Sequence, residues 1–286
     1  MAILADESMI LQMAVKEMTT SLDRALAVLE LIEQTPGGMG SGEIRRRLQI
    51  PKSSYGYLIT RLIDKGYVMR DQETHQYKIG LTPLVLAYGA LREMGFRSAT
   101  EPTLYRLVSE TGLAASIGVM ERHRVLLVDR VESPEFAMEA VDFANRGGKP
   151  VFGRIIRQRR ERDIGRELPA HSNALGKVLL AHLSRRHVLE IIAKEGLPSI
   201  TPKTIVSKVK LLAELERVRR QGFAESDEEQ YLGVRGVAAP IFDASGETCA
   251  AVSITGDPAR EVWKDSKRLI ELVRAGGWAI SKSMRL

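Results

Sequence analysis

The sequence predicts an α+β protein with two domains, a small one built from helices and a hairpin and a larger one of mixed helices and strands. Three observations predict this organisation. The 286 residues exceed the usual size of one domain. Up to residue 80 the apolar periodicity is helical and ends in a hairpin pattern, and beyond residue 100 helical and strand-like stretches alternate. We therefore expect a tail or short extra helix over 1–19, a first domain over 20–81, a linker helix over 82–99 and a second domain over 100–286.

The composition places the chain among globular proteins of a reducing compartment. Apolar residues make up 44% and charged residues 27% of the sequence, which excludes disordered and fibrous classes. The single cysteine, Cys249, has no partner for a disulfide. Charged residues interrupt the first twenty positions, and no apolar run is long enough to cross a membrane. These features predict a cytoplasmic protein without a membrane partner.

The first helix of the small domain has a clear start and a clear stop. Thr20–Asp23 fits a capping box, and Thr35–Gly38 ends the helix with proline and glycine. Between them, apolar residues recur at the spacing of one helical face, which we expect to be buried. The residues of this face are Leu22, Ala25, Leu26, Leu29 and Ile32.

Two further helices follow, separated by a proline. The second begins at Ser41 and the third at Lys52, directly after the break at Ile50-Pro51. The third helix has two faces. One is an apolar stripe made by Tyr55, Leu58, Ile59 and Leu62, and the other carries Ser54, Tyr57 and Arg61. Hydroxyl, phenol and guanidinium groups on one helical face can bind phosphates and base edges in a DNA major groove.

The segments 67–70 and 76–79 are typical of two strands joined by the polar turn 71–75. Three helices followed by such a hairpin predict a winged helix-turn-helix, and eight basic against four acidic residues over 41–80 fit a DNA partner. The whole chain has a net charge of +6. The alternative is a small helical domain with ordinary solvated faces. For double-stranded DNA, we expect base contacts from Ser53, Ser54, Tyr57 and Arg61, and phosphate or minor-groove contacts from Arg45, Arg46, Arg47, Lys52, Gln72, Thr74 and His75.

A helix over 81–95 carries apolar residues around much of its surface and therefore needs a partner. One candidate is the same helix of a second copy, because a domain that reads a two-fold operator acts as a dimer. The other candidate is packing within the chain itself. The apolar residues are Leu84, Leu86, Ala87, Leu91 and Met94.

The second domain is predicted to contain a sheet covered by helices. A Ser245-Gly246 turn between two apolar stretches indicates a hairpin. Gly222 marks the end of one long helical pattern. The expected helices lie around 104–108 and over 204–220 and 265–282, and the expected strands lie over 115–120, 125–131, 238–243 and 248–256.

The patterns of cofactor and metal sites are missing from the second domain. Gly176-Lys177 lacks the preceding glycine and the following hydroxyl of a phosphate-binding loop. His182 and His187 are five residues apart, which is off the i, i+4 spacing of a helical zinc pair. We therefore expect neither a cofactor nor a metal.

The patterns of catalysis are equally weak. The adjacent acids Asp227–Glu229 are typical of a solvated turn or helix entry, and Cys249 lies in an apolar strand as part of the core. An enzyme would have to draw its nucleophile and base from Ser172, His171 or Ser253. We expect no catalytic residues and no enzymatic activity.

Taken together, these residues resemble the IclR family of bacterial transcriptional regulators, from about residue 20 to the C-terminus. The resemblance is specific in three places. Thr20–Leu29 opens the winged domain as in family members, and Ile50–Ser54 with Gly66–Val68 matches the recognition helix and the wing. His171–Lys177 matches the motif His-x-x-Ala-x-Gly-Lys. A third match is the signature formed by Gly222–Ala224, Asp227–Glu229, Gly233–Arg235 and Ala238–Ile241.

The resemblance implies a homodimer or homotetramer that binds an operator through its N-terminal domains. It also implies a GAF-like C-terminal domain that binds a small effector, often an organic acid, and so controls operator affinity. Carried over residue by residue, the effector contacts are Ala174, Leu175, Ser226, Gly236, Ser253 and Thr255.

Two departures from the family pattern keep a second possibility open. Ser226 stands where the family usually has an acidic residue, and Gly236 stands where a cysteine is common. The alternative to an effector sensor is a DNA-binding regulator whose second domain only oligomerises and binds no small ligand. Thermal shift against a panel of small acids separates the two possibilities.

The stretch over 138–163 is longer than the family usually has at this place, and we expect it to form a surface excursion. Its part over 144–160 contains six basic residues and no acidic one. It forms either a second anionic contact or a subunit interface, or it is a solvated loop or helix.

Overall fold

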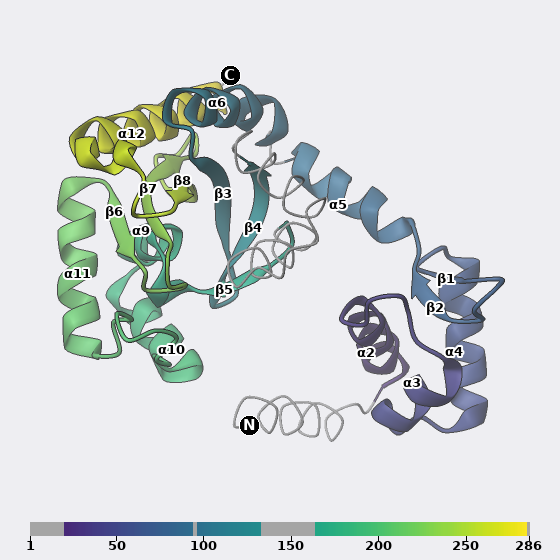
Figure 1. Ribbon diagram of the computed structural model, residues 1–286. Coiled ribbons are helices and arrows are strands. Elements are labelled where there is room, and N and C mark those ends of the chain that lie inside the picture. The colour runs from purple at the N-terminus through teal and green to yellow at the C-terminus, as the bar shows by residue number, and fades with distance from the viewer. Residues whose placement is uncertain (1–19, 94–95, 133–163, 285–286) are drawn as a thin grey trace. The chain divides into compact units, whose positions relative to one another are not determined.

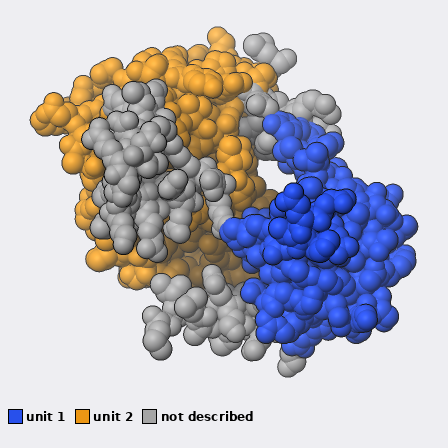
Figure 2. Space-filling view, turned by 45° about the vertical axis from the view of Figure 1, so that its right-hand side comes forward, with its two compact units in different colours: residues 1–94 blue, residues 95–286 orange. Residues whose placement is uncertain are grey.

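A computed structural model describes residues 20–93, 96–132 and 164–284. The chain divides into two compact units, residues 1–94 and 95–286 (Figures 1 and 2). The tail 1–19 and the basic segment 144–160 lie outside the described residues. Among the described residues, no helix combines the length and the apolar character needed to span a membrane.

The first unit is a helix-turn-helix with a wing. Helices α2 (Ser21–Glu33), α3 (Ser41–Leu48) and α4 (Lys52–Asp64) are followed by the antiparallel strands β1 (Val68–Arg70) and β2 (Tyr77–Ile79) and by α5 (Thr82–Glu93). The predicted capping box is present, with the Thr20 Oγ1 accepting from the Asp23 N–H and the Asp23 carboxylate accepting from the Thr20 N–H. Gln49 ends α3 in the left-handed conformation, and Pro51 then caps α4. The predicted winged helix-turn-helix is confirmed.

The predicted buried face of α2 is partly wrong. Leu22 and Leu26 are 67% and 49% exposed, whereas Val28, Leu31 and Ile32 are buried. Apolar residues occupy so many positions of this helix that two overlapping faces satisfy the same spacing. The choice between them is made by packing against the core of the unit, to which Ile44, Leu48, Tyr55, Leu58, Ile59 and Val68 contribute.

The second unit contains a six-stranded antiparallel sheet in the order β5-β4-β3-β8-β7-β6. Its strands are β3 (Ala114–Glu121), β4 (Arg124–Val131), β5 (Glu167–Pro169), β6 (Ala224–Asp227), β7 (Arg235–Phe242) and β8 (Thr248–Gly256). The helices α6 (Phe96–Thr111) and α12 (Ser266–Ser283) cover one face. The other face carries α9 (Ala174–His182) and α11 (Lys208–Gln221), with α10 (Arg185–Glu195) beside them (Figure 1). The predicted helix-covered sheet is confirmed.

Both faces of the sheet are apolar because helices cover both. Along β7, Val237, Ala239 and Ile241 pack into the core under α6 and α12, while Ala238 packs under α9 and α11. The helix expected over 204–220 begins later, at Lys208, because the Ser207 side chain accepts from the Lys210 N–H and caps it there. The second unit begins at Gly95, five residues before the boundary expected from the sequence.

Candidate functional site

The predicted base-reading residues lie together on the solvent side of α4. Its apolar stripe, Tyr55, Leu58 and Ile59, is buried in the core. The opposite side therefore faces outward, and Tyr57 is 71% exposed there, with Ser53 and Arg61 also exposed and Ser54 half-buried. An aromatic side chain that is this exposed does not pack in the core. It is therefore available for contact with another molecule.

The predicted phosphate contacts lie on three elements. Lys52 is exposed at the start of α4, and Gln72, Thr74 and His75 are exposed in the turn of the wing. The wing turn is held by Asp71, whose Oδ1 accepts from the N–H of Glu73 and of Thr74. Its other oxygen pairs with Lys78 at 2.6 Å, and this ion pair holds the pKa of Asp71 well below its usual value.

The arginines of α3 are the third group. Arg47 and Arg46 pair with Glu43 one turn earlier, with the Arg47 Nε at 2.7 Å from Oε1, and both lower the pKa of the Glu43 carboxyl. Arg45 is half-buried instead. Exposed ion pairs of this kind contribute little to stability, so a phosphate can replace the carboxylate as the partner.

The six predicted effector contacts all line one pocket in the second unit, with a volume of about 90 Å³. The sheet register explains how three of them meet: Ser226 on β6 is paired with Gly236 on β7, which is paired with Thr255 on β8. Ser253 lies two residues along β8 on the same face, and Ala174 and Leu175 come from the first turn of α9. Residues from 174 to 255 are thus brought together by the sheet and the helix packed on it.

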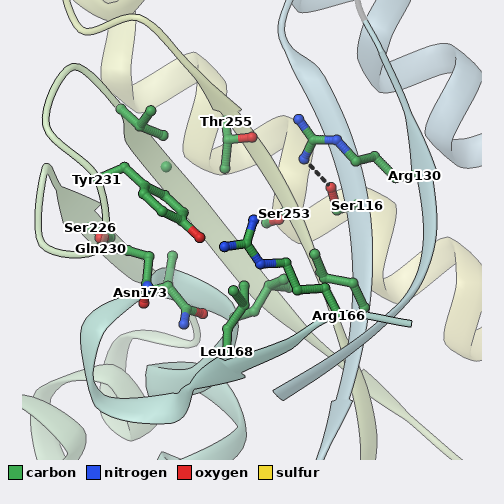
Figure 3. A pocket seen from close by; sticks show the side chains of 15 residues that line it. Ser116, Arg130, Arg166, Leu168, Asn173, Ser226, Gln230, Tyr231, Ser253 and Thr255 are labelled. Atoms are coloured by element: carbon green, nitrogen blue, oxygen red, sulfur yellow. Dashed lines mark hydrogen bonds between the residues drawn. The ribbon is translucent and has the colours of Figure 1, made fainter. Parts of the chain in front are cut away.

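Sequence reasoning missed most of the polar groups of this pocket. Figure 3 shows Arg166 reaching toward Tyr231 and Arg130 bonded to Ser116. The Arg166 guanidinium lies 5.6 Å from the centre of the Tyr231 ring, and the Arg130 Nη1 donates to the Ser116 Oγ at 2.8 Å. Further polar groups come from Asn173 and Gln230.

The charged side chains in the described lining of the pocket are two arginines, with no aspartate or glutamate among them. Arg130 is also held by Glu132, with the Nε 2.5 Å from Oε1, which fixes its guanidinium beside the pocket. A cationic, partly apolar cavity of this kind favours a small anion over a neutral or cationic molecule.

Ser253 contributes a buried hydroxyl without a partner. The residue is 1% exposed, and its Oγ has no hydrogen-bond partner among the described residues. An unpaired buried hydroxyl costs free energy, which a polar ligand in the pocket can recover. The first turn of α9 lies at the same pocket, and its Gly176 N–H is capped by the Asn173 side chain at 2.9 Å.

Two of the three residues considered for enzymatic chemistry, His171 and Ser172, have structural roles. Burial lowers the pKa of His171, whose Nε2 lies 3.1 Å from the Pro198 carbonyl oxygen. The Ser172 hydroxyl donates to the Pro169 carbonyl oxygen and to the Gln230 side chain. Within residues 20–93, 96–132 and 164–284, no three His, Cys, Asp or Glu side chains gather as metal ligands.

The interpretation of Asp227–Glu229 as a solvated acidic turn is only partly correct. Asp227 and Glu228 are bound by Lys203, at 3.0 Å from the Asp227 Oδ2. Glu229 is buried instead and pairs with Lys177 at 2.7 Å. A buried carboxylate requires such a partner because burial without one is costly.

Comparisons with known proteins agree with this architecture. A family model described as the IclR helix-turn-helix domain matches residues 21–72, and one described as the C-terminal part of bacterial transcriptional regulator IclR matches residues 154–282. The transcriptional repressor IclR of Escherichia coli is 29% identical over 242 residues, which are 84% of this chain and 81% of the relative.

Two solved structures add to the comparison. An IclR homologue from Microbacterium hydrocarbonoxydans, crystallised with 4-hydroxybenzoate, superposes with a TM-score of 0.76 at 21% identity and covers 93% of this chain and 99% of its own. The inducer-binding domain of a double mutant of the PobR transcription factor from Acinetobacter, in complex with 3-hydroxybenzoic acid, is 29% identical with a TM-score of 0.52. It covers 65% of this chain and 96% of its own.

The two family models together match more than half of the chain, in the order and in the two units that the fold displays. The relatives are regulators of transcription and not enzymes. The chain belongs to the IclR family of bacterial DNA-binding transcriptional regulators.

Proposed function

We propose that this chain is a sequence-specific regulator whose affinity for its DNA operator is controlled by a small carboxylic acid bound in the pocket. The observation that carries the proposal is the pocket wall: two arginines, no described acidic residue, and the buried, unpaired hydroxyl of Ser253. A carboxylate satisfies both features, because it carries the charge that the arginines favour and accepts the hydrogen bond that the serine can donate.

The size of the pocket limits which acids are candidates for the effector. Its volume of about 90 Å³ is below the roughly 150 Å³ of an engineered cavity that accepts benzene. Acids of a few carbon atoms fit this space, and because the pocket is not closed to solvent, a larger acid can extend out of it. Hydroxybenzoates occupy two of the similar solved structures, so both classes belong in the first screen.

The partners follow from the same proposal. The regulator acts as a homodimer or homotetramer on double-stranded DNA, in the cytoplasm where bacterial DNA lies. Occupancy of the pocket changes how the DNA-binding units of the oligomer are held, and reciprocity requires that operator binding change the affinity for the acid by the same factor.

The experiment is operator binding on the DNA that flanks the gene of this protein, measured at two salt concentrations with and without acids from two carbons to the hydroxybenzoates. One acid that changes saturable, site-specific binding supports the proposal. Thermal shift against the same acids gives an independent measure. Specific DNA binding that no acid of the panel changes would favour a regulator whose second unit only oligomerises.

Replacing Ser253 with alanine is expected to weaken binding of the active acid by roughly 10- to 150-fold, since a hydrogen bond to a charged group contributes about 1.5–3 kcal/mol. The stability of the acid-free protein should stay the same or rise, because the variant removes a buried hydroxyl that has no described partner. Isothermal titration and thermal unfolding measure the two quantities. Ser245→Ala, in the exposed β7–β8 turn, is the control for acid binding, which it should leave unchanged although it removes an exposed hydrogen bond to Asp243.

Replacing Arg61 with alanine is expected to reduce specific operator binding by about 1–3 kcal/mol, or roughly 5- to 150-fold, and non-specific binding much less. The reason is that a side chain on the exposed face of α4 can read base edges, whereas a phosphate contact cannot distinguish sequences. Fluorescence anisotropy with operator and scrambled DNA measures both affinities. Arg46→Ala serves as the control, with an equal loss on both DNAs. An equal loss for Arg61→Ala as well would reduce that residue to a phosphate contact.

A further inference from the structure

One wall of the pocket is a short closed loop. Residues 228–234 join β6 to β7, and we name them the pocket loop because Gln230, Tyr231 and Val234 line the pocket. The loop is bonded to itself. The Glu228 N–H donates to the Val234 carbonyl oxygen at 2.9 Å, and the Gly233 N–H donates to the Glu228 Oε1 at 2.6 Å. The loop therefore moves as one rigid unit, and its position determines where its three pocket-lining side chains lie.

A buried ion pair ties this loop to the opposite wall. Lys177 is 2% exposed on α9, the helix whose first turn carries Ala174 and Leu175 into the pocket wall. Its Nζ donates to the Glu229 Oε1 at 2.7 Å and lies 3.5 Å from the Glu214 Oε1 on α11. The pair thus connects α9, α11 and the pocket loop at a single ammonium group.

Two threonines complete the attachment of the loop. The hydroxyl of Thr201 donates to the Glu228 carbonyl oxygen, and that of Thr204 donates to the Glu229 carbonyl oxygen, each at 2.7 Å. These bonds fix the start of the loop backbone. Lys203 also pairs with the Glu228 carboxylate, and the Ser172 hydroxyl bonds to Gln230 from the segment before α9. The ion pair is the described side-chain bond from α9 itself, directly before the lining residue Gln230.

Stability alone does not account for this pair. An apolar pair of similar volume is often as stable as a buried ion pair or more so, because burying two charges is costly. The second oxygen of Glu229 is buried with no described hydrogen-bond partner, which adds to that cost. An ion pair fixes the position of its two side chains relative to each other, because its strength depends on distance and direction. An apolar contact does not.

We propose that Lys177 and Glu229 are positioning residues that hold the pocket loop at the distance from α9 at which its side chains meet the bound acid. Neither residue lines the pocket. The part of the inference that concerns the acid rests on the proposed function, whereas the part that concerns the loop stands without it.

The test uses the full chain with Lys177→Met and Glu229→Met combined. This variant removes both charges and keeps their volume, and Glu214 keeps Arg217 as an ion-pair partner at 2.8 Å. Its stability should therefore equal or exceed that of the wild type, while Lys177→Met alone leaves Glu229 buried without its partner and loses stability. Hydrogen exchange of the pocket-loop amides, without any added acid, should be at least tenfold faster in the double variant. The amides of β8 should be unchanged.

Glu195→Gln is the control, because it breaks the 2.9 Å pair with Arg124 on other elements of the same unit. Pocket-loop exchange should stay at the wild-type rate in this variant. If the double variant also exchanges at the wild-type rate, the loop is held without the pair and the inference is overturned.

A second measurement uses 4-hydroxybenzoate as the probe. If the wild type binds it, the double variant should bind at least tenfold more weakly despite its restored stability, and equal affinity would overturn the role in binding. If the wild type does not bind this probe, that result bears on the proposed function. The exchange rates still decide whether the pair positions the loop.

Discussion

Replacing Gly176 with alanine is expected to lower the free energy of unfolding of the second unit by at least about 3 kcal/mol, the upper range for overpacking. A Cβ at this position would lie 2.1 Å from the carbonyl oxygen of Ala170 and 2.5 Å from its Cα. The obstacle is backbone, which cannot rotate away as a side chain can. The glycine of the His-x-x-Ala-x-Gly-Lys motif thus lets α9 lie directly against the segment before it.

The same substitution is expected to abolish binding of the acid. Relief of the clash requires α9 to move away from Ala170, and the first turn of α9 carries Ala174 and Leu175 in the pocket wall. A shift of about 1 Å at a preorganised site is enough to lose most of its affinity.

Thermal and urea unfolding of the full chain, with exchange followed in each unit, measure this prediction. Gly89→Ala on α5 is the matched control, because a Cβ added there would meet no atom of the described residues within 4 Å beyond its own stretch of helix, and alanine favours a helix by up to about 1 kcal/mol over glycine. A Gly176→Ala protein that unfolds at the wild-type temperature and still binds acid would show that α9 has room to move.

The winged unit could be predicted from the sequence because its signals are local. The capping box at Thr20, the break at Pro51 and the hairpin pattern each act within a few residues, and all three are present in the structure. The buried face of α2 could not be predicted, since the choice between Leu26 and Leu31 depends on what the helix packs against. Periodicity identifies a helix but not its neighbour.

The polar contacts of the pocket, in contrast, could not be predicted from local sequence patterns. The resemblance placed six positions that the structure brings together, but it said nothing of the arginines beside them. In β4, Leu127 and Arg130 both line the pocket although they are three residues apart, because a bulge shifts the register opposite Ile117 and Gly118. A period of two cannot anticipate such a shift. The partner of Lys177 was equally hidden, since Glu229 is 52 residues away in the sequence.

Placing glutamates at Leu84 and Val85 together is expected to weaken operator binding by at least about 100-fold, equivalent to about 2.7 kcal/mol. Leu84, Val85 and Tyr88 of α5, with Leu81 just before the helix, recur at i, i+3, i+4 and i+7 and are 47–74% exposed, and Leu86 is exposed off this stripe. A contiguous apolar stripe of this kind is typical of a protein interface. We expect a second copy of the chain as the partner of this helix, because a domain that reads a two-fold operator acts as a dimer.

The loss follows from the geometry of a two-fold operator. If the stripe joins two copies, binding of one winged unit to its half-site places the second unit at a high effective concentration near the other half-site. Separate monomers lose this advantage. Light scattering should show monomers, and anisotropy should show weak operator binding, while the winged unit keeps its circular dichroism and its melting temperature.

Ala90→Glu adds a charge to the opposite side of the same helix, about 190° from the centre of the stripe at 100° per residue, and separates an interface effect from a charge effect. This control should remain a dimer and bind the operator within about twofold of the wild type, because an exposed substitution outside an interface costs less than about 0.5 kcal/mol. If the double variant of Leu84 and Val85 also remains a dimer with full affinity, the copies must be joined elsewhere. The exposed stripe of α5 would then require another partner.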